Sequence, residues 1–150
     1  MNVPTTILPD HHRLCDDAFV AAENAVGRGD WKGATAALGR FEARMYAHFD
    51  AEENVLFPEF EAITGMTRGP TEMMRYEHEQ MRALLEQMDA ACAAHDADAY
   101  SGEAETLLML MQQHNMKEEN ILYPMCDRAL GPAAEAMGAK LRAVLDEANG

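Results

Sequence analysis

Residues 48–58 read HFDAEENVLFP, and residues 114–124 read HNMKEENILYP. Both segments follow the pattern H-x-x-x-E-E-N-[VI]-L-[FY]-P, and they start 66 residues apart, at positions 48 and 114. The same offset relates His12 to His78. The repeat therefore matches the first half of the chain with the second, and it predicts a fold with an approximate two-fold axis through its middle.

The sequence around the repeat predicts helices throughout. Ala, Leu, Met, Glu, Gln and Arg dominate, all of them good helix formers, and no stretch alternates apolar and polar residues over the length of a strand. Prolines, glycines and N-capping aspartates divide the chain into segments. We expect helices from Asp10 to about residue 27, from Asp30 to Pro58 (which should end or kink the helix), from Pro70 to the break at 95–98, and from there to Pro124.

Four long amphipathic helices with short connections predict an all-α fold, an up-down-up-down four-helix bundle. A short fifth helix, opened by Gly131 and Pro132, should pack on the outside or extend one end. We expect a single domain over residues 1–150, with the bundle at about 10–127 and the C-terminal helix at about 131–148.

Composition and charge exclude several classes of protein. The 150 residues are 48% apolar and carry a net charge of −14. An acidic surface repels phosphate backbones and anionic lipids, so we expect neither nucleic acid nor a membrane as a partner. No apolar run approaches the length of a membrane span, and residues 1–9 do not resemble a secretion signal.

The cysteines point away from disulfide or thiolate zinc chemistry. Their number is odd, their spacing is wide and there is no CxxC; they are Cys15, Cys92 and Cys126. A cytoplasmic location is the natural expectation for such a chain.

The repeated polar residues are unusual for a helix face that is otherwise apolar. A histidine and a glutamate four residues apart lie on the same face, and a bare carboxylate inside a bundle costs several kcal/mol. A single such pair is usually a surface contact, but the repetition favours a dinuclear metal site. The candidate ligands are His12, His48, Glu52, His78, His114 and Glu118.

Over about residues 5–130, the chain resembles the bacterial hemerythrin-like, or hemerythrin HHE cation-binding, domain proteins. The resemblance is carried by these candidate ligands, by the pair Glu77-His78 and by the run from His114 to Pro124. The resemblance implies two iron ions with an oxo or hydroxo bridge, each bound by two histidines and both bridged by Glu52 and Glu118. Imidazole and carboxylate ligands also allow manganese or zinc.

The resemblance further implies a protein that binds or senses O2, NO or peroxide. Arg82 stands where oxygen-carrying hemerythrins have a fifth histidine, which argues against reversible oxygen carriage. A di-iron enzyme of the peroxidase or NO-reductase type, and an iron store or donor for iron-sulfur cluster repair, remain open. The expected partner is a small diatomic molecule or peroxide, together with an unidentified electron donor.

Several neighbours of the candidate ligands carry expectations of their own. Cys15 is read as a small buried residue, with a thiol near the metal as the alternative. Asp16 should form an ion pair with Arg82, or else supply an extra ligand. His11 should be a solvated residue at the helix start, and Tyr123 a structural one.

The second glutamate of each repeat carries a further expectation. Glu53 and Glu119 lie about 100° round the helix from the candidate ligands. They should therefore point toward solvent or toward a neighbouring helix.

Overall fold

A computed structural model describes residues 2–149. In chain order the α-helices of this part are α1 (Pro4–Gly27), α2 (Trp31–Asp50), α3 (Phe57–Thr64), α4 (Pro70–Ala93), α5 (Ala97–Lys117), α6 (Tyr123–Leu130) and α7 (Ala134–Asn149). Two π-helical segments, η1 (Ala51–Leu56) and η2 (Glu118–Leu122), join α2 to α3 and α5 to α6. A 3-10 turn, η3 (Gly131–Ala133), precedes α7.

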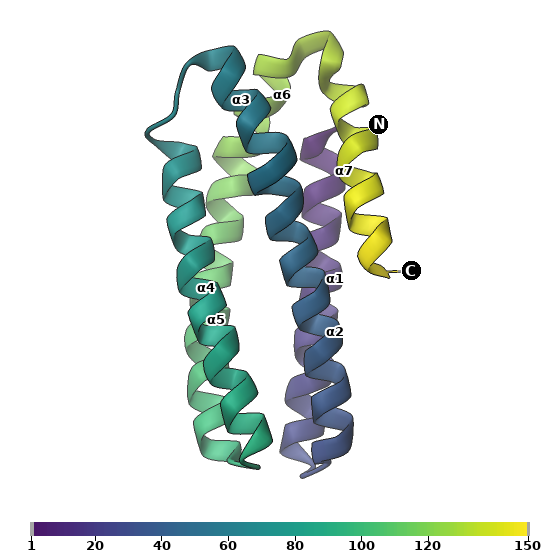
Figure 1. Ribbon diagram of the computed structural model, residues 1–150, viewed down its shortest axis with the longest axis vertical. Coiled ribbons are helices and arrows are strands. Elements are labelled where there is room, and N and C mark those ends of the chain that lie inside the picture. The colour runs from purple at the N-terminus through teal and green to yellow at the C-terminus, as the bar shows by residue number, and fades with distance from the viewer. Residues whose placement is uncertain (1, 150) are drawn as a thin grey trace.

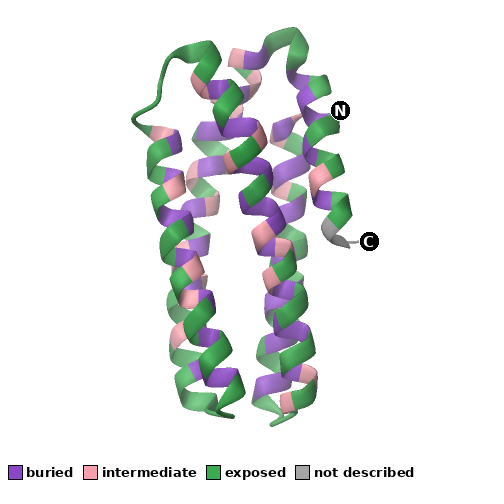
Figure 2. Ribbon diagram, in the orientation of Figure 1, coloured by how far each residue is buried: buried purple, intermediate pink, exposed green. Residues whose placement is uncertain are grey.

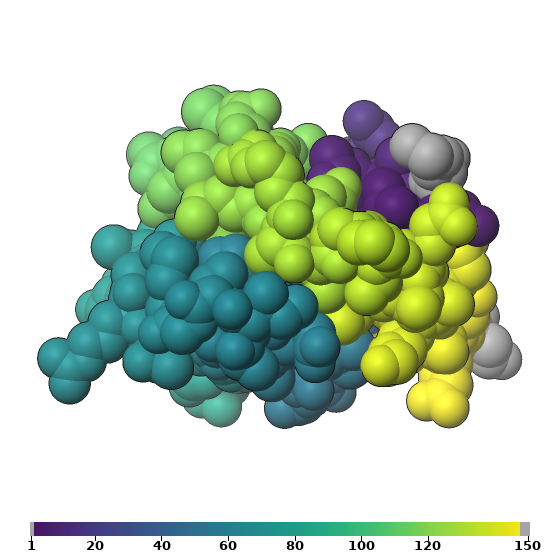
Figure 3. All heavy atoms as spheres, turned by 90° about the horizontal axis from the view of Figure 1, so that it is seen from above, coloured from purple at the N-terminus to yellow at the C-terminus, as the bar shows by residue number. Residues whose placement is uncertain are grey.

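The long helices α1, α2, α4 and α5 form the bundle, and α7 packs on its outside against α1 and α2 (Figure 1). Neighbours along the chain are neighbours in space, and the contacts of α1 with α5 and of α2 with α4 close the bundle. Helices α1 and α4 are therefore diagonal to each other. Seen from above, the chain around α3, α6 and α7 covers one end (Figure 3). The predicted all-α bundle with a fifth helix is confirmed.

Helix α1 begins at Pro4, earlier than the predicted start at Asp10. Proline suits the first turn, where its missing N–H leaves no helical hydrogen bond unmade. The Thr6 hydroxyl donates to the Val3 carbonyl at 2.9 Å and accepts from the Val3 N–H at 3.1 Å, which fixes this end. The added turns bury Leu8 in the core, and this burial outweighs the capping preference of Asp10, which lies exposed inside the helix.

The turns between the helices contain the capping aspartates and the glycine that the sequence predicts there. The carboxylates of Asp30 and Asp96 accept hydrogen bonds from the N–H groups of Gly33, at 2.9 Å, and Ala99, at 3.0 Å. These bonds satisfy N–H groups that have no partner within the helix. Gly65 has a φ of 73°, in the left-handed region that glycine adopts without strain, and it ends α3.

The chain stays helical past both prolines of the repeat, through a π turn in each half. The N–H of the residue before each proline reaches back five residues, from Phe57 to the Glu52 carbonyl and from Tyr123 to the Glu118 carbonyl. A π turn holds more residues per turn than an α-helix. The residues within it are rotated accordingly, so that both glutamates of each E-E pair can face inward.

The long helices bury the faces that they turn toward one another (Figure 2). The apolar residues among those that are buried form two clusters. The first lies toward the α1–α2 and α4–α5 turns and includes Phe19, Phe41 and Leu107. The second lies under α3, α6 and α7 and includes Leu56 and Leu141. Buried histidines and glutamates lie between the two clusters. Within residues 2–149, no helix is long and apolar enough to cross a membrane.

Leu141 tests whether α7 belongs to the core. Its side chain is fully buried in the second cluster, so Leu141→Ala should lower the free energy of unfolding by about 2–5 kcal/mol, because it leaves a cavity. Lys140→Ala, on the exposed side of the same helix, should change it by less than about 0.5 kcal/mol. Urea denaturation measures both. Equal stabilities would show that α7 is not part of the core.

Candidate metal centre

A layer of buried imidazoles and carboxylates lies between the two apolar clusters. Each long helix of the bundle contributes one histidine, and each π segment contributes one glutamate. They are His12 (α1), His48 (α2), His78 (α4), His114 (α5), Glu52 (η1) and Glu118 (η2). All six are buried, and Glu52, His78 and Glu118 are completely inaccessible to solvent. The structure thus brings together all six predicted ligands; that they bind metal stays a prediction.

The two glutamates connect the two halves of the repeat. Glu118 Oε1 lies 3.1 Å from His12 Nε2 and 3.2 Å from His114 Nε2. Glu52 Oε1 lies 3.1 Å from His78 Nε2 and 3.5 Å from His48 Nε2. Each carboxylate therefore reaches one histidine from each half, which is the arrangement expected of a carboxylate that bridges two metal ions.

The ligand atoms form two overlapping groups with metal-site spacing. In each group, all the ligand atoms lie within 4.8 Å of one another. One group is Glu52, His78, His114 and Glu118, and the other is His12, His48 and Glu118.

Four atoms of the first group lack hydrogen-bond partners. Among the side chains that the structure describes, the buried unpaired atoms include Nε2 of His78 and of His114, Oε1 of Glu52 and Oε2 of Glu118. Some lie close to one another, but none is aligned for a hydrogen bond. Unpaired buried polar groups are rare and cost about 1–3 kcal/mol each. Their convergence in one layer fits a bound cation, which needs free lone pairs.

The carboxylates of this layer favour the protonated, positively charged form of two of its histidines. Burial disfavours the charged forms of His12 and His114, but the charge of Glu118 and the hydrogen bonds of their Nδ1 atoms to Glu119 and Glu77 outweigh it. The pKa of His12 rises to about 9 and that of His114 to about 10. Burial also opposes the ionisation of Glu52, yet the charge of His48 and the neighbouring His78 hold its pKa well below the usual value. Protons or metal ions can supply the charge required.

A second ring of side chains holds the far nitrogens of three histidines. The Nδ1–Oε distances are 2.7 Å for His12 to Glu119, 2.6 Å for His78 to Glu53 and 2.8 Å for His114 to Glu77. Such a partner orients the imidazole and fixes the tautomer that leaves Nε2 free for a metal. Glu53 and Glu119 thus take the second of their two expected positions, on a histidine of a neighbouring helix. The sequence signal was the second glutamate of each E-E pair.

Cations hold two of these outer carboxylates. Lys117 Nζ lies 2.5 Å from Glu77 Oε2, and the Arg82 guanidinium lies 3.0 Å from Glu53 Oε2. Both carboxylates are therefore kept ionised and fixed in place behind their histidines.

His11 occupies the fourth outer position, behind His48. Its Nδ1 lies 2.9 Å from His48 Nδ1, and the two rings stack with their centroids 5.1 Å apart. Burial, followed by the charges of His48, His12 and Arg44, lowers the pKa of His11 to about 3, so the ring is neutral. The prediction that His11 is solvated was wrong, because α1 begins at Pro4 and carries this residue inside the bundle.

Tyr123 reaches the middle of the layer, which its interpretation as a structural residue missed. Its hydroxyl lies 2.6 Å from Glu52 Oε2 and 2.8 Å from Glu118 Oε1. It also lies 3.3 Å from Nε2 of both His12 and His48. Burial beside two carboxylates raises the pKa of this phenol far above its usual value. The sequence signal was the aromatic position of the repeat, which is Phe in the first copy and Tyr in the second.

The expected ion pair between Asp16 and Arg82 does not form. Arg82 pairs instead with Glu53 and Glu79 on the α2–α4 side of the bundle. Asp16 lines a groove on the α1–α5 side. The prediction failed because α1 and α4 are diagonal, so that equivalent positions lie on opposite faces.

Cys15 fits its interpretation as a small buried residue. Burial raises the pKa of its thiol to about 12, and its Sγ lies 3.8 Å from Nδ1 of His11, a residue of the outer ring. The thiol therefore stays protonated and packs against the outer ring.

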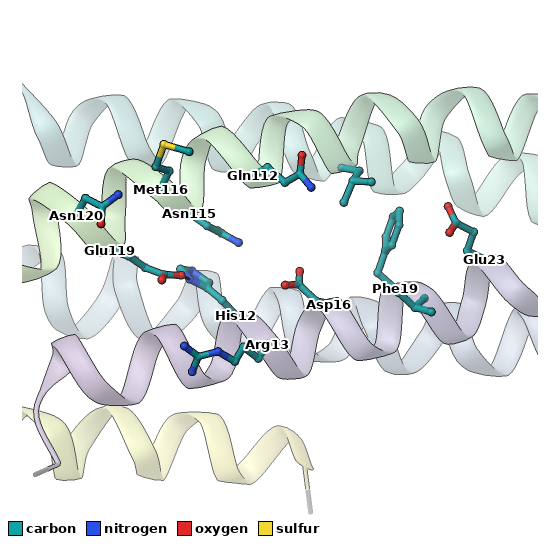
Figure 4. A pocket seen from close by; sticks show the side chains of 12 residues that line it. His12, Arg13, Asp16, Phe19, Glu23, Gln112, Asn115, Met116, Glu119 and Asn120 are labelled. Carbon is teal, nitrogen blue, oxygen red and sulfur yellow. Dashed lines mark hydrogen bonds and ion pairs between the residues drawn. The ribbon is translucent and has the colours of Figure 1, made fainter.

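A groove of about 680 Å³ opens between α1 and α5 and leads to the edge of the layer. Its lining includes Asp16, His12 and Asn115, with Glu119 beside His12 (Figure 4). A second, smaller space of about 10 Å³ lies further inside. It shares two lining residues with the groove, His12 and Asn115. Its remaining lining is largely apolar: Cys15, Met45, His48, Phe49, Met81, Met111 and His114. That volume admits about one water-sized group.

The opposite face of the bundle is closed by a stacked pair. The Arg82 guanidinium carbon lies 4.9 Å from the centroid of the Phe49 ring, between α2 and α4. The repeat places Asp16 and Asn115 at the corresponding positions of the groove side.

Without metal, the protein should lose stability as the pH rises from 6.5 to about 10. The folded chain raises the pKa of His12 to about 9 and that of His114 to about 10, from 6.5. Their stabilising charge is fully present below pH 6.5 and is lost as the pH passes these values. Urea denaturation of chelator-treated protein measures this. Equal or greater stability at pH 10 would contradict the charge balance, and bound metal should reduce the dependence.

Comparison with known proteins agrees with this geometry. The family model of the hemerythrin HHE cation binding domain matches residues 3–126, which include all six predicted ligands. No curated protein and no solved structure matches the chain. Because the match spans well over half of its length, the chain belongs to the hemerythrin HHE cation-binding domain family.

Proposed function

We propose that this protein holds two iron ions in the buried layer and uses them to bind or sense a small oxidant: O2, NO or peroxide. The observation that carries the proposal is the reach of Glu52 and of Glu118 to one histidine from each half of the repeat. Imidazole with carboxylate suits iron, and manganese or zinc could substitute.

The proposed ligands divide between the two ions. His12 and His48 would hold one ion, His78 and His114 the other, and Glu52 and Glu118 both. An iron pair supplies electrons to, or shares them with, a small oxidant. The chain itself fixes the imidazoles through their outer partners and excludes bulk water with an apolar cluster on each side.

The space beside the layer supports a small ligand. The inner space of about 10 Å³ has a lining made mainly of thioether, thiol and aromatic groups besides its histidines. Such a lining favours an uncharged molecule of two or three atoms over a larger or ionic substrate. The groove between α1 and α5 leads from solvent to its border at His12 and Asn115.

The alternatives differ in the fate of the iron and of the oxidant. An iron donor must release its metal readily, whereas the proposed ligands here are buried to at least 95%. A peroxidase or NO reductase would turn its ligand over with electrons from an unidentified donor. The proposal includes no nucleic-acid or membrane partner, which the net charge of −14 supports. It also includes a cytoplasmic location, which the cysteine pattern supports.

Metal analysis and spectroscopy test the proposal. Protein purified without oxygen should contain two irons per chain, and its absorption spectrum should change on exposure to O2, NO or peroxide. A stable, reversible adduct would support binding or sensing, whereas bleaching with product formation would show an enzyme. Rapid transfer of iron to a chelator would show a donor. A single metal per chain would contradict the two-ion centre.

Glutamine variants of the neighbouring glutamates test which carboxylates bridge. Glu118→Gln removes a charge from the oxygen shared by both halves, so its metal content should fall to one ion per chain or less. Glu119→Gln keeps an oxygen that accepts from His12 Nδ1. Its content should stay near two, with an affinity about 10–100-fold weaker, as for other partners of metal-binding histidines.

The pair Glu52→Gln and Glu53→Gln should repeat this contrast in the other half of the repeat. Chelator competition and elemental analysis give both quantities. If Glu119→Gln emptied the site while Glu118→Gln did not, the assignment of the bridging residue would be wrong.

A further inference from the structure

The four polar contacts of Tyr123 point to a role beyond packing. Its side chain is completely buried, and its oxygen lies 2.6 Å from Glu52 Oε2 and 2.8 Å from Glu118 Oε1. The same oxygen lies 3.3 Å from Nε2 of His12 and of His48. A phenol has a single proton to donate, so it cannot make four hydrogen bonds of this kind at once.

The same distances are those found between ligands of one metal ion. With metal–ligand bonds of about 2.0–2.2 Å, two ligands at right angles lie about 3 Å apart. The phenolic oxygen lies within a few tenths of an ångström of this separation from all four neighbouring atoms. Phenolate is an established ligand of iron in proteins. The oxygen is therefore placed as a further ligand beside His12 and His48.

The π segment η2 brings the oxygen to this position. The Tyr123 N–H bonds to the Glu118 carbonyl, five residues back, so that the tyrosine stands one π turn above the glutamate. In an α-helix, a residue five positions on would lie about 140° away around the axis. The π turn is thus what aims both side chains into the same layer.

The repeat makes the position asymmetric. The residue equivalent to Tyr123 is Phe57, whose ring lies 6.2 Å from that of His78, centroid to centroid. Phe57 offers no oxygen. The half with His78 and His114 therefore has one protein ligand fewer.

We propose that Tyr123 is a ligand of the metal ion held by His12 and His48, which gives that ion one protein ligand more than the ion held by His78 and His114. The inference rests on the proposed function. On binding, the metal replaces the phenolic proton, which leaves to the buffer. A bound cation provides the charge that stabilises the phenolate.

Resonance Raman and visible absorption of the iron(III) protein test this assignment. We expect an absorption band from phenolate to iron, and excitation in that band should enhance tyrosine ring vibrations. Tyr123→Phe should lose both signals and keep its histidine and glutamate ligands. Tyr100→Phe is the matched control, because Tyr100 is also buried but lies in the first apolar cluster. It should keep both signals.

Isotope labelling keeps the test independent of whether the variant folds. In the wild-type protein, ring-deuterated tyrosine should shift the enhanced vibrations. If a protein with two bound irons shows no tyrosine vibrations, or if Tyr123→Phe keeps them, the phenol is a hydrogen-bond donor only and the inference is wrong. If the wild-type protein does not bind two irons at all, the proposed function fails first, so the two failures can be told apart.

Discussion

Two carboxyl groups, those of Glu52 and Glu118, lie completely buried inside an apolar bundle, and the rest of the structure follows from this constraint. A buried charge without compensation costs several kcal/mol, so each long helix must bring an imidazole to the same level. This requirement fixes how far each helix can slide along its neighbours. The imidazoles in turn have outer partners, and cations nearer the surface pair with two of these partners. Negative and positive groups therefore alternate from the middle of the layer outward.

The two π turns supply the geometry that regular helices cannot. In an α-helix, adjacent glutamates diverge by about 100°, whereas a π turn, with more residues per turn, brings their directions closer together. In η1 and η2, the first glutamate of the pair enters the layer and the second holds a histidine of a neighbouring helix. The prolines that follow have no N–H to contribute to a helix, so a π turn just before them adds little disruption.

Much of this could be predicted from the sequence, because a repeat carries geometric information. Polar residues that recur at a fixed offset on an apolar face point into the core from both halves, and this identified all six candidate ligands and the bundle. The surroundings were harder to predict. The start of α1 depends on the burial of Leu8 against α7, a tertiary contact that outweighs local capping. His11 was misjudged as a consequence. The position of Tyr123 depends on a π turn, which has no simple pattern of residue types.

The differences between the two halves give the layer a direction. The halves agree at the histidines and glutamates that face the middle, but they differ around them: His11 corresponds to Glu77, and Phe57 corresponds to Tyr123. In the first half, the group behind His48 is the neutral ring of His11. In the second half, the group behind His114 is the Glu77 carboxylate, which is paired with Lys117. A molecule bound between the halves would therefore experience an electric field along the line that joins them, although the repeat by itself would make its two ends equivalent.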